Sequence, residues 1–63
     1  MIDLDTIKQN ANKTLEIQKN SIDTWKLGEI IMAIALGKFE NDLTIKITNG
    51  CVEFNNGCII KII

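Results

Sequence analysis

The sequence from Leu43 to Ile63, LTIKITNGCVEFNNGCIIKII, decides which fold the chain is expected to adopt. Runs rich in alternating apolar residues, at about 43–48, 51–54 and 58–63, are separated by Asn49-Gly50 and by Asn55-Asn56-Gly57. Asn-Gly between two such runs is the strongest short-range signal for a β-hairpin, because a type I′ turn needs a positive φ at both central positions. The stretch therefore predicts a three-stranded antiparallel meander.

The register of this meander follows from its two turns. A two-residue first turn places Lys46 opposite Glu53, so that opposite charges meet across the strands. A three-residue second loop keeps Lys61 outside, whereas a two-residue loop would turn its charge inward. The face expected to be buried then carries Leu43, Ile45, Ile47, Val52, Phe54, Cys58, Ile60 and Ile62.

The last predicted strand leaves two apolar residues on the outer face of the sheet. Ile59 and Ile63 lie there on either side of Lys61, at what is expected to be an edge strand. An apolar edge with unpaired backbone groups is a template for pairing with another chain. We therefore predict an interface at Ile59, Lys61 and Ile63, with ordinary surface isoleucines as the alternative.

Two helices, at about 3–20 and 24–36, are expected to cover the buried face of the sheet. Apolar residues recur at helical spacing in the first, and the cluster 20–24 is rich in capping residues that favour a break over one bent helix. The expected stripe of the first helix is Leu4, Ile7, Ala11 and Leu15. The expected core stripe of the second is Leu27, Ile30, Ile31, Ile34 and Ala35, widened by Trp25, Met32 and Leu36.

The end of the second helix carries its own signal. Gly37 is expected to take the left-handed conformation that closes many helices, with Phe39 supplying the accompanying apolar contact. Glu40-Asn41-Asp42 is expected to form a short polar loop into the sheet.

The predicted fold class is thus α+β, with two N-terminal helices packed on a three-stranded antiparallel β-meander in a single small domain, residues 1–63. A chain of 63 residues buries only about 60% of its unfolded surface. Small domains usually add disulfides, a metal or a partner chain to compensate. We expect self-association or a larger protein partner to supply the missing stability.

Candidate chemical groups are few. The sequence has no His, and the predicted register places Cys51 and Cys58 on opposite faces of the sheet, which excludes a disulfide between them. Two Cys do not make a zinc site, and His, the usual base for a Cys nucleophile, is absent. Glu40 and Asp42 are interpreted as a solvated loop, because a calcium loop needs more ligands at a set spacing. No catalytic, cofactor or metal site is expected, and the chain is predicted not to be an enzyme.

Trp25 is the single Trp and stands at the start of the second predicted helix. It has two interpretations: a residue of the core or of the contact with the first helix, or the anchor of an interface or ligand pocket.

Charge and hydropathy narrow the partners and the compartment. A net charge of −1 with no Arg argues against binding to a phosphate backbone. The longest apolar stretch, residues 30–36, is too short to span a bilayer. The start of the chain, Met1-Ile2-Asp3-Leu4-Asp5, has no basic region before an apolar run, so a cytoplasmic location without a secretory signal is expected.

In its size, its acidic composition without Arg and the layout of Trp25 to Ile63, the chain resembles small accessory proteins encoded by bacteriophages and other mobile elements. The resemblance implies a host-cytoplasmic location. It also implies an anti-defence role, since some such proteins mask a nucleic-acid-binding surface or hold a signalling nucleotide.

The leading hypothesis is a non-enzymatic binding protein that acts by occupying a protein surface, such as an inhibitor of a host defence system. One alternative is a structural subunit of an obligate homo-oligomer. The other is an oligomer that binds a nucleotide or another small molecule between its subunits.

Overall fold

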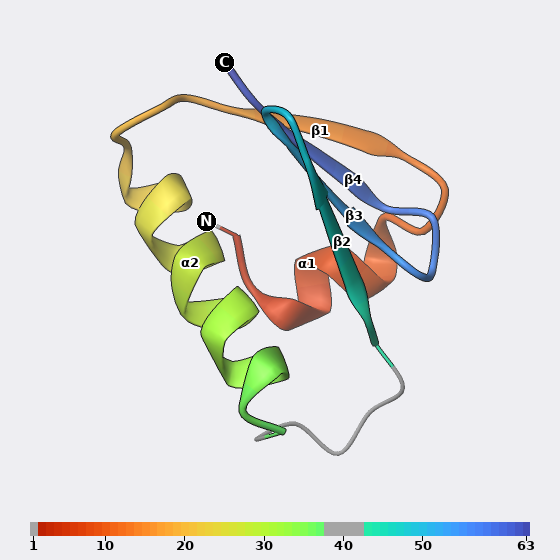
Figure 1. Ribbon diagram of the computed structural model, residues 1–63. Coiled ribbons are helices and arrows are strands. Elements are labelled where there is room, and N and C mark those ends of the chain that lie inside the picture. The colour runs from red at the N-terminus through yellow and green to blue at the C-terminus, as the bar shows by residue number, and fades with distance from the viewer. Residues whose placement is uncertain (1, 38–42) are drawn as a thin grey trace.

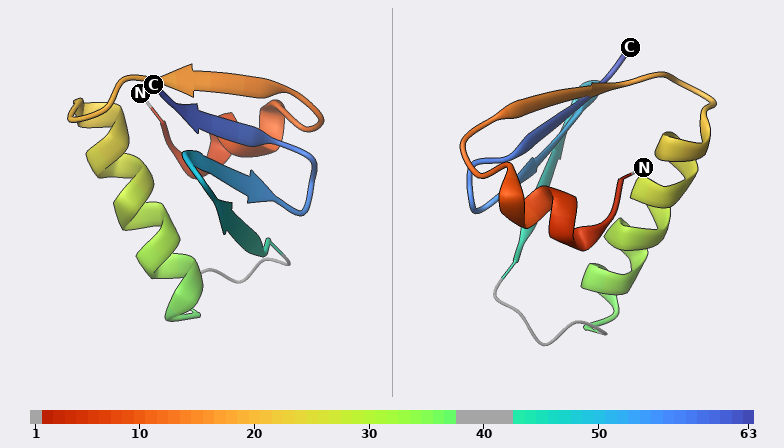
Figure 2. Two further views of the ribbon diagram at one scale, coloured as in Figure 1. Left: turned by 45° about the horizontal axis from the view of Figure 1, so that its top comes forward. Right: turned by 180° about the vertical axis from the view of Figure 1, so that it is seen from behind.

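The computed structural model, which describes residues 2–37 and 43–63, shows an α+β fold with two helices on one side of a four-stranded sheet (Figure 1, Figure 2). The strand order is β1-β4-β3-β2. In chain order the elements are α1 (Leu4–Gln9), β1 (Thr14–Ile17), α2 (Ile22–Ala35), β2 (Ile45–Thr48), β3 (Cys51–Phe54) and β4 (Ile59–Ile62).

The predicted three-stranded antiparallel meander is wrong as a description of the sheet, because a fourth strand from the N-terminal part joins it. β1 runs parallel to β4, and the backbone N–H of Ile59 donates to the carbonyl of Lys13 at 2.9 Å. The N–H of Ile63 likewise donates to the carbonyl of Ile17 at 2.9 Å. β4 is therefore an inner strand, and the edges of the sheet are β1 and β2.

The predicted helix at 3–20 is also wrong over most of its length. α1 has six residues, begins at the N-cap Asp3 and ends at Asn10, after which Asn12 takes a left-handed φ of 62°. Thr14–Ile17 then alternate exposed and more buried positions, with Ile17 buried. Leu15 fits both the helical period and the two-residue period of a strand, but Ile17 fits only the strand period. In the strand both side chains face the core.

Asp3 caps α1 with its carboxylate. The backbone N–H and the hydroxyl of Thr6 both donate to Asp3 Oδ1 at 2.8 Å. These hydrogen bonds favour the ionised form and lower the pKa of the Asp3 carboxyl below its usual value. The cap supplies a partner for an amide that the helix itself leaves unpaired.

The predicted break before the second helix is confirmed, although α2 begins earlier than residue 24. Asn20 has a φ of 62°, and Ser21 is the N-cap, accepting from the Thr24 N–H at 3.4 Å. The hydroxyls of Ser21 and Thr24 both donate to the Gln18 carbonyl at 2.6 Å. The short polar side chains of this cluster therefore bond local backbone instead of continuing a helix.

At the other end of α2, Gly37 has the predicted left-handed φ, at 68°, and its N–H donates to the Ile34 carbonyl at 3.0 Å. The predicted contact of Phe39 and the loop Glu40-Asn41-Asp42 lie outside the described residues.

The register predicted for β2, β3 and β4 is confirmed. Lys46 pairs with Glu53, and Val52 pairs with Ile60. The predicted type I′ turn is wrong in detail, because Gly50 has a φ of 76° while Asn49 has no positive φ. One left-handed position at Gly50 is sufficient to close this hairpin.

One core lies between the helices and the sheet. Ile7, Leu27, Cys58 and Ile60 are almost or completely inaccessible to solvent. Ile47 was predicted on the buried face but is 63% exposed. It lies on the edge strand β2, close to the turn, because its pair with Val52 is the second from the turn. The buried residues are Ile2, Ile7, Ile17, Leu27, Ile30, Val52, Phe54, Cys58 and Ile60.

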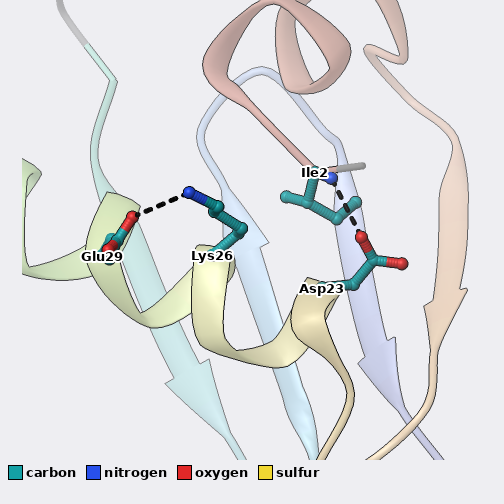
Figure 3. Close-up of polar contacts among 4 residues, drawn as sticks. All are labelled: Ile2, Asp23, Lys26 and Glu29. Carbon is teal, nitrogen blue, oxygen red and sulfur yellow. Dashed lines mark hydrogen bonds and ion pairs between the residues drawn. The ribbon is translucent and has the colours of Figure 1, made fainter.

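Polar contacts join the N-terminal segment to the rest of the fold. The backbone N–H of Ile2 donates to Asp23 Oδ1 at 3.2 Å, at the first turn of α2 (Figure 3). At the other end of α1, the Asn56 side-chain amide donates to the Ile7 carbonyl at 3.0 Å. These contacts hold α1 against both α2 and the loop between β3 and β4.

Candidate interaction surface

α2 carries apolar side chains on the side that faces away from the core. Ile22, Trp25, Met32 and Leu36, the last at the C-cap, are each 60–65% exposed. Gly28 and Glu29 are exposed between them. We call these six residues the outer face of α2. A solvent-facing side of a helix normally carries mostly charged and polar residues, so this composition is typical of a contact surface.

A shallow groove of about 610 Å³ runs along this outer face from the start of α2 to Met32. Along the helix it is lined by Trp25, Gly28, Glu29 and Met32. Its polar end is formed by Asn20, Ser21 and Thr24, the residues that begin α2. The groove exists because Gly28 has no side chain to fill the space between Trp25 and Met32.

Lys26 borders the outer face and contacts two of its residues. Its Nζ lies 5.4 Å from the centroid of the Trp25 ring and 3.7 Å from Glu29 Oε2 (Figure 3 shows the Lys26–Glu29 pair). Both contacts are partly solvated, with Lys26 33% and Glu29 52% exposed, so each contributes little to stability. They do place one positive and one negative group beside the apolar side chains.

The structure separates the four residues predicted to form an interface. Trp25 is 62% exposed on the outer face of α2, which excludes its interpretation as a core residue. Ile59 and Lys61 lie on the outer face of the sheet, Ile59 half-buried between Thr14 and Glu53, and Lys61 exposed between Glu16 and Cys51. Trp25 and the residues of β4 therefore do not form one surface.

The unpaired edge expected at Ile59 and Ile63 is wrong, because β4 has a strand on each side. Ile63 is 57% exposed through its side chain, but its N–H donates to Ile17 and its carbonyl accepts from the Lys19 N–H at 2.8 Å. Among the described residues, four of the six exposed large apolar side chains lie on α2 or its C-cap. The main apolar surface of the described chain is thus the outer face of α2.

Sequence reasoning assigned Met32 and Leu36 to the core and did not single out Ile22. A signal for all three is present in the spacing of positions 22, 25, 29, 32 and 36, which alternates between three and four residues. That spacing belongs to helices that pair with other helices. It was obscured because the core stripe of α2 runs along the opposite side of the same helix.

The described residues offer no metal-binding cluster, since no three of their Cys, Asp or Glu side chains are grouped to hold an ion. Both Cys are free, and they lie on opposite faces of the sheet as predicted. Cys58 is completely buried, and burial raises the pKa of its thiol above the usual value. Cys51 is only half-buried, on the outer face.

We expect the two thiols to differ sharply in reactivity. In the folded protein at pH 8, Ellman's reagent should titrate Cys51 alone, while Cys58 should react at least about 100-fold more slowly, because it requires unfolding. A Cys51→Ser variant should show only the slow reaction, and urea should abolish the difference. Equal rates for both thiols in the native protein would contradict the burial of Cys58.

Neither helix in the described part of the chain is long and apolar enough to cross a membrane. The sequence matches no family model, and comparison with curated proteins and with solved structures found no match.

Proposed function

We propose that this protein is a non-enzymatic protein-binding module whose contact surface is the outer face of α2. The observation that supports the proposal is the exposure of Ile22, Trp25, Met32 and Leu36 along one side of one helix. Trp is among the residues that contribute most to interfaces, and Met adapts readily to a partner's shape. Covering these side chains would remove from water four of the six exposed large apolar side chains of the described residues.

A macromolecular partner suits this surface better than a small ligand. Its apolar side chains follow the length of a 14-residue helix instead of converging on an enclosed cavity. The groove beside Trp25 is open and has a single carboxylate, that of Glu29. Without a cluster of positive charge, the surface has no means of attracting a nucleic acid. Occupying a protein surface is also the mode of action expected from the resemblance to small phage-encoded inhibitors.

Site-specific photo-cross-linking tests this proposal. A benzophenone amino acid at position 32 should yield a covalent adduct with a protein in cells of the encoding organism. The same group at position 46, an exposed position on the other side of the molecule, is the control and should yield none. Adding Trp25→Asp should lower the yield from position 32 by at least about tenfold, since losing a central aromatic contact weakens binding that much.

Two results would contradict the proposed function. One is a similar yield of adducts from positions 32 and 46. The other is a yield from position 32 that Trp25→Asp leaves unchanged.

A further inference from the structure

The outer face of α2 has the spacing of a helix–helix seam. Positions 22, 25, 29, 32 and 36 follow one another at intervals of three, four, three and four residues. Leu27 and Ile30, which are buried, lie on the opposite side of the helix. α2 therefore has one apolar side for its own core and a second, at coiled-coil spacing, that the described chain leaves uncovered.

Gly28 gives a second, independent indication that something approaches this face closely. It lies in the middle of α2 without a positive φ, so its backbone conformation does not require glycine. A Cβ built there would meet nothing within 4 Å, so packing within the chain does not require it either. Glycine inside a helix lowers stability relative to alanine, and one use that offsets this cost is to let another group approach the backbone closely. The space beside Gly28 is where a second helix would cross α2.

We propose that α2 pairs antiparallel with the α2 of a second copy of this chain, about a twofold axis close to Gly28. This inference rests on the proposed function, because it identifies the partner of the same outer face. An axis between residues 27 and 28 exchanges position 26 with position 29. Lys26 of each copy then lies beside Glu29 of the other, and Ile22 lies near the second copy's Met32.

The charges favour a second copy in this orientation. A parallel pairing would place Glu29 next to Glu29 within the apolar seam, where like charges repel. The antiparallel pairing replaces the repulsion with two Lys26–Glu29 contacts, because a twofold interface repeats each contact. A helix of unrelated sequence would have to match both the spacing and the charges, whereas a second copy does so through symmetry alone.

The size of the surface sets the expected strength of the pairing. A 14-residue helix is about 21 Å long, and one side of it offers less than the roughly 800 Å² per partner of a standard stable interface. We therefore expect a dissociation constant in the range of about 10–100 µM.

Sedimentation equilibrium of the purified chain, from about 1 to 500 µM, measures the dimer directly over the expected range. Trp25 is the single Trp, so its fluorescence emission should shift to shorter wavelength as dimer forms. Trp25→Ala should weaken the dimer about 30-fold, and Gly28→Ala about tenfold although it favours the helix of the monomer. Ile47→Ala, at an equally exposed isoleucine outside α2, should leave the dimer unchanged.

A charge-exchange experiment tests whether Lys26 and Glu29 face a second copy of the chain. Lys26→Glu and Glu29→Lys should each weaken self-association at least about tenfold, because each places like charges side by side across the axis. An equimolar mixture of the two variants should associate at least as well as the unchanged protein, since every contact across the axis is then between opposite charges. Restoration by mixing cannot arise from the pairing of these residues within one helix.

The inference is overturned if the unchanged chain is monomeric at 500 µM, or if the mixture associates no better than either variant alone. A monomeric chain that still gives adducts from position 32 to a different protein would overturn the inference and leave the proposed function standing. Loss of the adducts would overturn the proposed function itself.

Discussion

Replacing Ile60 with alanine is expected to lower the free energy of unfolding by about 3–4 kcal/mol. Ile60 is completely buried in the inner strand β4, between Leu15 of β1 and Val52 of β3. Truncation removes apolar contacts on both sides and leaves a cavity that flanking strands cannot readily fill. A 63-residue domain has a free energy of unfolding of about 3–9 kcal/mol, so this loss removes at least about a third of it.

Urea denaturation followed by circular dichroism measures this loss, at one protein concentration because self-association adds to apparent stability. Ile47→Ala is the matched control: the same atoms are removed from a side chain that is 63% exposed. We expect it to cost no more than about 0.5 kcal/mol. Equal losses for Ile60→Ala and Ile47→Ala would contradict the position of β4 inside the sheet.

Replacing Gly57 with alanine is expected to lower the free energy of unfolding by about 3 kcal/mol, from two separate causes. Gly57 has a φ of 90°, which residues with a Cβ rarely adopt. The added Cβ would also overlap the Asn12 side chain and lie 3.1 Å from its Cα. The side chain can rotate away, but the backbone contact remains, so the loop between β3 and β4 must move away from the turn before β1.

Two further variants separate these causes. Gly50→Ala has the same backbone problem, at a φ of 76°, but the nearest atom to its Cβ is 3.9 Å away. It should cost only about 1–2 kcal/mol. In the Gly57→Ala background, Asn12→Gly removes the overlapping side chain and suits the left-handed φ of position 12, so it should recover at least about 1 kcal/mol. Equal losses at Gly50 and Gly57, without recovery, would show that close approach to Asn12 is unimportant.

The pairing of β2 with β3 could be predicted from the sequence because it depends on residues that are close together in the chain. Asn49-Gly50 lies between strands that pair with their immediate neighbours, and the Lys46–Glu53 pair distinguishes one register from the next. A shift of one residue would turn the whole apolar set outward. For this reason the register was predicted correctly even though the turn type was not.

The N-terminal part was misread because its partner is remote. Leu4, Ile7, Ala11 and Leu15 satisfy a helical period, and the competing alternation of Thr14-Leu15-Glu16-Ile17 is only four residues long. What makes this segment a strand is its pairing with β4, more than 40 positions later in the chain. The same pairing makes β4 an inner strand. The interface predicted there assumed an edge strand with unpaired backbone groups, and that assumption is wrong.

For the candidate surface, sequence reasoning identified Trp25 but could not choose between its two interpretations. α2 is apolar on both sides, so composition alone did not show which side the sheet would bury. Once Leu27 and Ile30 face the core, helical geometry places Trp25, Met32 and Leu36 outside.

The amino-acid sequence by itself determined the hairpin register, the capped start of α2 and the left-handed end at Gly37, because each depends on residues a few positions apart. Tertiary structure alone decided that β1 completes the sheet, that β4 lies inside it, and that the seam of α2 faces outward. These features depend on which of several apolar surfaces pack together, and that choice minimises the exposed apolar area of the whole chain. The outer face of α2, with four of the six exposed large apolar side chains of the described residues, is where this minimisation is least complete.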